Sequence, residues 1–420
     1  MSLNAAGPRE PHPDMGFLEF VLLIAAMMSL GALGIDSMLP NLPAIGESLG
    51  VADENRRQLI LTVYLLGFGG SQLVYGPLAD RFGRKPVLTV GLVLYTGFSL
   101  VAAFASSFEL LLAARVLQGI GAAATRAIPV SIVRDRFAGR AMARVMSLTS
   151  MVFMGAPILA PSLGQAVLYL ASWPYLFGLL GAFGACVLCW SLFRLRETLH
   201  PEDRLPIIPS RILASFATAA RDRTAISYTI AQTLLFGGIL GFINSSQQVF
   251  ADTFHAANLF APVFAIAASF IAIASLLNAR LVGRLGMRVI SHTALIGFLV
   301  IAATHLAIAA SGRETLVIFT VFQAATLFTF GLTSGNYGAM AMEPMGHIAG
   351  VASAFQGFVS MVGASLIGFF IGQHFDGTVV PVEAGYLVCG LASLGAVLVA
   401  EHGRLFQPHQ HVPVRHGAAE

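Results

Sequence analysis

The sequence predicts an all-α integral membrane protein with twelve transmembrane helices in two pseudo-symmetric six-helix bundles. Of its 420 residues 56% are hydrophobic and 11% are charged, against roughly half and a quarter in soluble domains. The chain divides about twelve times into apolar runs of the roughly 20 residues that a helix needs to cross a bilayer. A long polar segment separates the sixth run from the seventh.

The predicted spans are rich in Gly, Ala and Ser and lack the even alternation of barrel strands. Helices satisfy their own backbone groups in lipid, and small residues let neighbouring helices approach closely. We place the spans near 17–39, 58–78, 86–105, 109–132, 145–169, 173–194, 224–246, 258–279, 289–310, 314–339, 348–372 and 382–400.

The polar segment 195–223 contains three prolines and mixed charges, and we interpret it as a cytoplasmic linker. It separates an N-terminal bundle, 17–194, from a C-terminal bundle, 224–400, with tails at 1–16 and 401–420. Arginines crowd the loops after the even-numbered spans. By the positive-inside rule both tails are cytoplasmic, in a bacterial-type inner (plasma) membrane.

The two halves echo each other in sequence. Ala79–Lys85, which follows the second span, reads ADRFGRK, and Val282–Arg288, 203 residues later, reads VGRLGMR. Two homologous bundles around a central site are the arrangement of many secondary transporters.

Composition also excludes several classes of function. The net charge of +3 offers no basic surface for nucleic acid, and the three cysteines all lie in apolar runs. The sequence contains no phosphate-binding loop, no His-Glu-x-x-His metal motif and no nucleophile elbow. We therefore expect no enzyme, no metal and no cofactor, and an ion gradient, preferably of protons, as the energy source.

Ionisable groups inside a bilayer are costly and are therefore functional candidates. Three lie well inside the predicted spans: Asp36 in the first, and Arg115 and Arg126 in the fourth. Helical spacing places several residues of the fourth span on one face, which we expect to line the interior. These residues are Arg115, Gly119, Ala122 and Arg126, with Gln118 beside them.

Burial disfavours the ionised form of Asp36, whereas a nearby arginine favours it. Asp36 and Arg115 are thus predicted to couple protons to a substrate. The alternatives are a static ion pair or an Asp36 hydrated near the outer surface. For Arg115 the alternative is interhelical hydrogen bonding, and for Arg126 it is snorkelling to water.

Gly76–Pro86, GPLADRFGRKP, lies after the second span. Its order and spacing resemble the signature of the major facilitator superfamily, a transporter family with this twelve-helix fold. The resemblance implies that Asp80, Arg81, Gly83 and Arg84, with Gly76 before them, form an inter-bundle latch. Such a latch stabilises the conformation closed to the cytoplasm.

Two further motifs narrow the resemblance. Arg115–Ala122 resembles the span-four motif of proton-coupled members, in which the arginine is tied to proton transfer. The fifth span resembles the antiporter motif, except that Ala160 stands where glycine is common; its matching residues are Gly155, Pro157, Pro161 and Gly164. Two prolines and two glycines also predict a bend with a smooth helix contact.

With Asp36–Pro40 and Val133–Asp135, these motifs resemble the bicyclomycin and chloramphenicol resistance (Bcr/CflA) branch of drug:proton antiporters. The resemblance implies efflux of small amphipathic compounds. The alternatives are export of a native metabolite, such as a siderophore or amino acid, and uptake by proton symport. The expected partners are a small-molecule substrate, protons and the lipid bilayer, for a monomer that binds no nucleic acid.

The second half is expected to contribute polar groups without buried carboxylates. Four amides are candidates for the substrate cavity or, alternatively, for interhelical hydrogen bonds: Gln232, Asn244, Gln323 and Asn336. His305 lies within the ninth span and is predicted to be a packed donor rather than a proton-coupling group.

Overall fold

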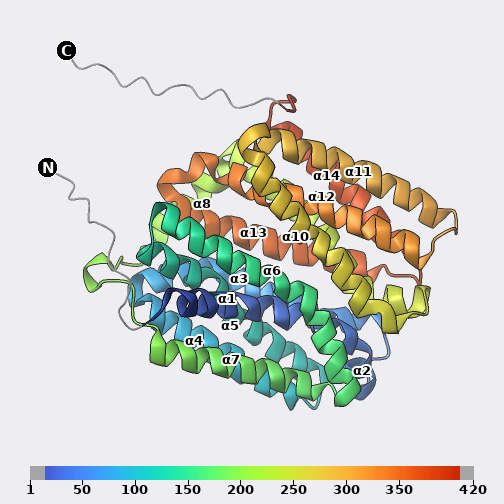
Figure 1. Ribbon diagram of the computed structural model, residues 1–420, viewed down its shortest axis with the longest axis horizontal. Helices are drawn as coiled ribbons and strands as arrows, with labels where there is room; N and C mark the ends of the chain where they lie inside the picture. The colour runs from blue at the N-terminus through green and yellow to red at the C-terminus, as the bar shows by residue number, and fades with distance from the viewer. Residues whose placement is uncertain (1–14, 407–420) are drawn as a thin grey trace.

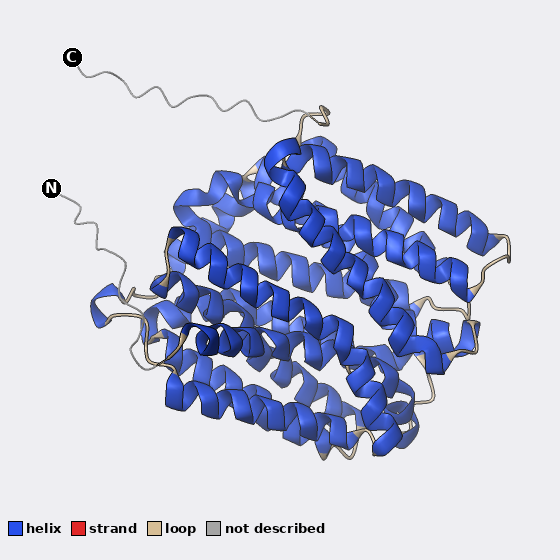
Figure 2. Cartoon of the chain, in the orientation of Figure 1, coloured by secondary structure: helices blue, strands red, loops and turns tan. Residues whose placement is uncertain are grey.

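A computed structural model describes residues 15–406, so residues 1–14 and 407–420 of the two predicted tails lie outside it. The described chain is helical, with short loops between helices (Figure 2). Eleven of its helical segments are long and apolar enough to cross a membrane. One of them, Leu316–Gln373, contains two helices joined by a short 3-10 segment, so the prediction of twelve spans is confirmed.

The twelve long helices fall into two sets of six (Figure 1). The first set is α1 (Phe17–Asp36), α3 (Leu59–Phe82), α4 (Arg84–Ala103), α5 (Phe108–Arg136), α6 (Gly139–Leu170) and α7 (Pro174–Arg194). The second is α9 (Arg223–Gln248), α10 (Phe260–Leu285), α11 (Met287–Ala310), α12 (Leu316–Met342), α13 (Ala349–Gln373) and α14 (Val380–Ala400). Shorter elements are α2 (Leu42–Ser48), α8 (Pro209–Arg221), η4 (Val249–Thr253) and η6 (Glu343–Ile348).

Helix ends differ from the predicted spans where charged residues continue a helix beyond its apolar part. The fifth long helix, α6, begins at Gly139 instead of near 145, and Arg140 and Arg144 lie in its first turns. The predicted linker also contains a helix, α8.

The repeated loop motif forms matching junctions in the two halves. Gly83 between α3 and α4 has φ 107°, and Gly286 between α10 and α11 has φ 80°. Glycine adopts these angles without strain from a side chain. Each junction places a buried arginine nearby: Arg84 pairs with Asp80 and Asp135, and Arg288 pairs with two glutamates, Glu343 and Glu401.

The two ends of the bundles differ in how the halves meet. We call the end that carries α8 the linker side, and the opposite end, which carries α2, the far side (Figure 1). One apolar core joins the halves on the far side, where Met38, Leu42 and Ile60 belong to the same cluster as Phe250 and Phe260. The halves are therefore packed together there.

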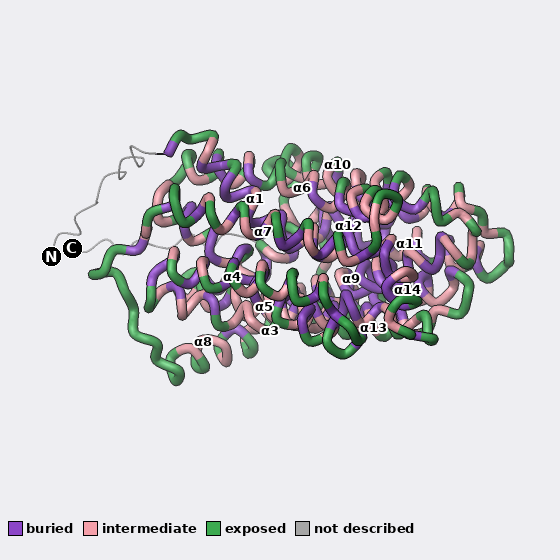
Figure 3. Tube along the Cα trace, turned by 90° about the horizontal axis from the view of Figure 1, so that it is seen from below, coloured by how far each residue is buried: buried purple, intermediate pink, exposed green. Residues whose placement is uncertain are grey.

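Toward the linker side the contact between the halves loosens. In α6, Ala156, Ala160 and Gly164 are buried, whereas only Val145 and Thr149 are buried in residues 139–152. In α10 no residue of 275–285 is buried. Exposed segments also mark the linker and much of α8 (Figure 3). The described conformation is thus closed on the far side and open toward the linker side.

Candidate functional site

Arg115 on α5 is completely buried, and each of its three guanidinium nitrogens donates a hydrogen bond within the first bundle. Its guanidinium donates to the carbonyl oxygens of Ile60 at 3.1 Å and Gly34 at 2.8 Å, and to Gln118 Oε1 at 2.7 Å. It also lies over the ring of Tyr64, 4.2 Å from the centroid. Arg115 thereby ties α5 to α1 and α3, which is the interhelical alternative for this residue.

The face of α5 around Arg115 packs closely against α3. A Cβ placed on Gly119 would overlap the carbonyl oxygen of Tyr64, so no larger residue fits without a shift of the backbone. Ala122 is completely buried on the same face, and Gln118 Nε2 donates to Ser99 Oγ at 2.7 Å. These residues lie within the N-terminal bundle in the described conformation, and they hold its helices together.

Asp36 is the last residue of α1, and its side chain is 7% exposed. No described residue gives it a hydrogen bond or an ion pair. Arg115 bonds to the carbonyl of Gly34 instead, so the static ion pair considered for Asp36 is absent in this conformation. A buried carboxylate without a counter-ion is costly when ionised and far less so when protonated.

The antiporter-like segment of α6 touches the chain just after Asp36. A Cβ on Gly164 would overlap the carbonyl oxygen of Ser37, and Asn41 Nδ2 donates to the carbonyl of Gly164 at 3.0 Å. The predicted smooth contact is thus present at Gly164, whereas Gly155 faces open space. Pro157 and Pro161 lie inside α6, which continues past both as one helix.

A network of amide side chains closes the far side between the bundles. Asn55 donates to the carbonyl oxygens of Gln373 and Phe375, and its own carbonyl accepts from Gln373 Nε2 at 2.7 Å. Gln248 Nε2 donates to Asn55 Oδ1 at 2.7 Å, and Gln58 Nε2 donates to Gln248 Oε1 at 2.6 Å. We call these residues, Asn55, Gln58, Gln248 and Gln373, the amide gate.

The predicted latch lies on the linker side, where the bundles are apart. Arg84 bonds to Asp80 and, at 3.0 Å, to Asp135, and the backbone amides of Arg84 and Lys85 donate to Glu197. All of these described contacts stay within the first bundle and the linker. Gly76 is half-buried, Arg81 is exposed, and Gly83 forms the turn. The inter-bundle contact remains a prediction for the other conformation.

Arg126 lies in the linker-side half of α5 and is exposed, with its guanidinium 5.3 Å from the ring centroid of Phe153. Solvent reaches the side chain, but protein atoms surround it closely on most sides, so its place is compatible with the predicted cavity position as well as with snorkelling.

Three of the four candidate amides in the second half are engaged with other polar side chains. Gln232 accepts from Gln356 at 3.2 Å, and Asn336 exchanges hydrogen bonds with Asn278 of α10. Gln323 bonds to two residues of α14. Asn244 is the exception, since it is 1% exposed and neither of its amide atoms has a partner among the described residues.

The expectation that the second half lacks buried carboxylates is wrong. Glu383, in the first turn of α14, is completely buried and lies 2.9 Å from His305 of α11. His305 also lies 3.0 Å from Glu314 in the loop before α12. Glu314 and Glu383 stand at the starts of their predicted spans, where a charge can reach water, so nothing in the sequence indicated that they meet His305. His305 is therefore neither isolated nor a packed donor alone.

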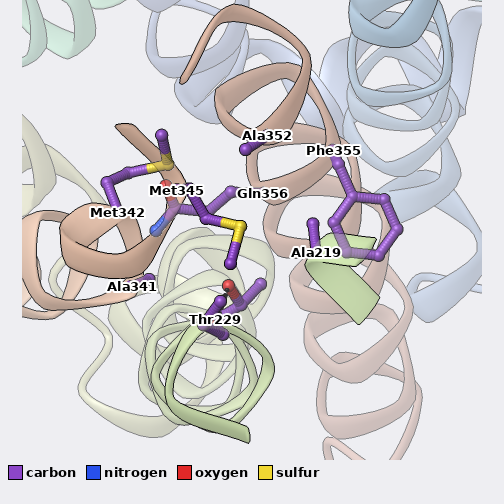
Figure 4. Close-up of a pocket in the computed structure, with 9 residues that line it drawn as sticks. Ala219, Thr229, Ala341, Met342, Met345, Ala352, Phe355 and Gln356 are labelled. Carbon is purple, nitrogen blue, oxygen red and sulfur yellow. Dashed lines mark hydrogen bonds between the residues drawn. The ribbon is translucent and has the colours of Figure 1, made fainter. Parts of the chain in front are cut away.

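The described surface has two openings of note. The cavity in Figure 4, between α8, α9, α12 and α13, holds about 10 Å³ and is lined mainly by methionine, alanine and Phe355. That volume suits one water molecule rather than an organic substrate. A larger cleft of about 440 Å³ lies on the far side, beside the amide gate, and is lined by Ala52, Asp53, Glu54, Asn55, Gln248, Asp252, Phe375 and Gly377.

The chain matches one protein family and is similar to several known proteins. The sequence pattern of the Major Facilitator Superfamily matches residues 22–402. The chain is 29% identical over 409 residues to the multidrug resistance protein MdtL of Klebsiella pneumoniae (strain 342), covering 94% of this chain and 99% of MdtL. It is 29% identical over 377 residues to the uncharacterized MFS-type transporter YdgK of Bacillus subtilis (strain 168), covering 87% and 91%.

Two solved structures share the fold. The human organic anion transporter MFSD10 (TETRAN) superposes with a TM-score of 0.69 at 18% identity, covering 93% of this chain and 100% of that one. A D-xylose-proton symporter superposes with a TM-score of 0.69 at 12% identity, covering 92% and 98%.

Proposed function

Because the chain belongs to the Major Facilitator Superfamily and is a multi-pass membrane transporter, we propose that it exports small amphipathic compounds in exchange for protons. The observation that carries the proposal is Asp36, a buried carboxylate with no partner among the described residues. A proton is the simplest ligand that neutralises it. Relatives named multidrug resistance proteins support efflux as the direction.

The arginine-rich linker side is the cytoplasmic side in this proposal, by the positive-inside rule. The described conformation then faces the cytoplasm, and the amide gate separates Asp36 from the outside. When the gate opens, an external proton neutralises Asp36 and substrate leaves. After the gate closes again, substrate arriving from the cytoplasm favours release of the proton inward, which completes the exchange.

Alternating access also needs a contact that closes the cytoplasmic side. We assign it to the predicted latch, Asp80, Arg81, Gly83 and Arg84. Arg84 already anchors α4 to the ends of α3 and α5, so the three helices can move as one body. In the outward-facing state the exposed groups of this segment would meet the second bundle. The transporter works as a monomer and needs no cofactor beyond the proton gradient.

The test is transport by the purified protein in proteoliposomes under an imposed pH gradient, with cationic, neutral and anionic amphipathic compounds. We expect accumulation in the direction of export, abolished by a protonophore and unchanged when sodium replaces potassium. Uptake that runs with the proton gradient, or transport driven by sodium alone, contradicts the proposal.

Asp36→Asn tests the coupling residue and Asp80→Asn tests the latch. We expect the first to reduce proton-driven transport to the level of protein-free vesicles, while substrate still binds. We expect the second to lower turnover with coupling intact. Undiminished proton-driven efflux by Asp36→Asn would remove Asp36 as the coupling site.

A further inference from the structure

The second bundle contains a compact buried group of three ionisable side chains, which we call the far-side triad: His305, Glu314 and Glu383. Nε2 of His305 lies 3.0 Å from Glu314 Oε1, and Nδ1 lies 2.9 Å from Glu383 Oε2. The imidazole thus stands between two carboxylates, one on each ring nitrogen. The triad joins α11, the loop before α12, and α14.

The triad is enclosed by closely packed side chains. The side chains of His305 and Glu383 have no exposure, and that of Glu314 is 9% exposed. The ring of Phe322 stacks on His305 with centroids 4.6 Å apart. Gln323 Nε2 donates to Glu383 Oε1 at 2.8 Å, and Tyr386 donates to Gln323 Oε1 at 3.0 Å. Neutral groups therefore complete the environment within the described chain.

The formal charges of the triad indicate that it can bind one more proton. Both ring nitrogens lie within ion-pair distance of a carboxylate, and the Nε2 contact with Glu314 is also aligned as a hydrogen bond, whereas the Nδ1 contact with Glu383 is not. With a doubly protonated imidazole and two ionised glutamates, the triad carries one net negative charge. In the described residues all ion pairs of both glutamates run to His305, so no second cation balances that charge. One further proton on a carboxylate makes the buried group neutral.

Two opposing effects act on the ionised glutamates. Glu383 lies in the first turn of α14, and Glu314 lies just before Thr315, the N-cap of α12. Helix N-termini favour negative charge. Burial with a net charge opposes it. Because these two effects oppose each other, the triad can take up and lose one proton. A neutral ion pair would lack the net charge that drives such uptake.

We propose that the far-side triad is a second proton-binding site, separate from Asp36, which takes up one proton from the far side. Glu314 is the entrance because it alone has exposed surface. Gln323 and Tyr386 end the polar chain within the described residues, so the proton returns by the way it came. Only the identification of the far side with the cell exterior rests on the proposed function.

Packing links the triad to the amide gate. The ring of His305 lies 6.0 Å from that of Phe319, and Phe319 lies 5.9 Å from Phe250. Phe250 belongs to η4, which begins directly after the gate residue Gln248. Through these ring contacts, a change in the charge of the triad shifts the position of η4, which follows Gln248. External pH thereby changes how readily the amide gate opens.

Infrared difference spectroscopy on the full-length protein in lipid tests proton binding directly. We use Asp36→Asn protein as the background, so that any carboxylic acid band that titrates comes from another group. We expect such a band, a shift of it when glutamate is labelled with ¹³C at its carboxyl carbon, and its loss in Glu383→Gln. Glu109→Gln, which alters an exposed carboxylate, should leave the band unchanged.

The absence of a titrating glutamate band in the background protein overturns the proposal, and this measurement needs no triad variant to fold. Survival of the band in both Glu383→Gln and Glu314→Gln also overturns it. In proteoliposomes, Glu383→Gln should flatten the dependence of transport on far-side pH while transport remains proton-driven. A protein that shows the band but no proton-driven export contradicts the proposed function and leaves the triad standing.

Discussion

The two bundles differ in whether their buried carboxylates have a partner of opposite charge. In the first, Arg115 is bonded to backbone carbonyls and an amide, and Asp36 stands apart from it without a partner among the described residues. In the second, His305 holds two glutamates within 3.0 Å. A buried carboxylate can thus be left to a mobile proton or supplied with a fixed partner. The first arrangement suits exchange of a proton with a substrate, and the second suits uptake and loss of one further proton by a group whose members are held in place by one another.

The buried carboxylates differ in this way although the two halves have the same arrangement of helices and junctions. Their junctions at Gly83 and Gly286 match in backbone angle and in the buried arginine, because both solve the same problem of turning between antiparallel helices. The buried carboxylates have no counterparts across the repeat. Structural positions are therefore repeated in the two halves, and the positions of ionisable groups inside the spans are not.

The largest effect is expected at Arg115. Arg115→Met leaves two carbonyl oxygens and Gln118 without their buried donor, and each acceptor left unsatisfied costs about 1–3 kcal/mol, so that the sum exceeds the other effects expected here. Arg115→Lys keeps the charge but cannot reach all three acceptors, so it should lie between Met and wild type. Thermal unfolding in detergent measures both. A Met variant as stable as wild type would show that Arg115 is not the fixed element of the first bundle.

Replacing one buried carboxylate in each bundle by its amide tests directly whether that carboxylate has a stabilising partner. Glu383→Gln removes a charged partner of His305 and should cost about 1–3 kcal/mol, whereas Asp36→Asn removes an unpartnered carboxylate and should leave stability unchanged or raised. The thermal midpoints of the two variants at one pH make the comparison. If Asp36→Asn is the less stable of the two, Asp36 has a fixed partner and the contrast fails.

A smaller effect is expected at the amide gate. Asn55→Ala removes hydrogen bonds that cross between the bundles, each contributing about 0.5–1.5 kcal/mol, and should shift molecules toward the far-side-open conformation. Distances between spin labels on the far-side ends of α3 and α13 report the shift. Ser71→Ala is a matched control, since Ser71 bonds only within α3. An unchanged distance distribution for Asn55→Ala would mean that the apolar core alone closes this side.

The smallest effect is expected at the surface. Arg56 and Glu109 are 3.7 Å apart with side chains 55% and 75% exposed. Water and salt screen such a pair, so Glu109→Gln should change neither thermal midpoint nor transport measurably. A clear loss in either would show that charge on the far side matters outside the buried groups.

The sequence by itself determined the membrane class, the twelve spans, the division into halves and the repeated junctions. These follow from local rules: an apolar run of sufficient length must be a helix in lipid, and a glycine-containing loop with positive φ marks a turn. It also singled out Asp36 and Arg115, because a charge in the middle of an apolar run is visible without knowing its neighbours.

Only the tertiary structure decided which buried groups meet. Arg115 bonds to Gly34 rather than to Asp36, and the far-side triad gathers residues that are up to 78 positions apart, from His305 to Glu383. The two glutamates of the triad lie at the starts of their predicted spans, where the sequence suggests contact with water. Their burial depends on how α11, α12 and α14 pack side by side, and the register of that packing is set by side-chain contacts among all three helices.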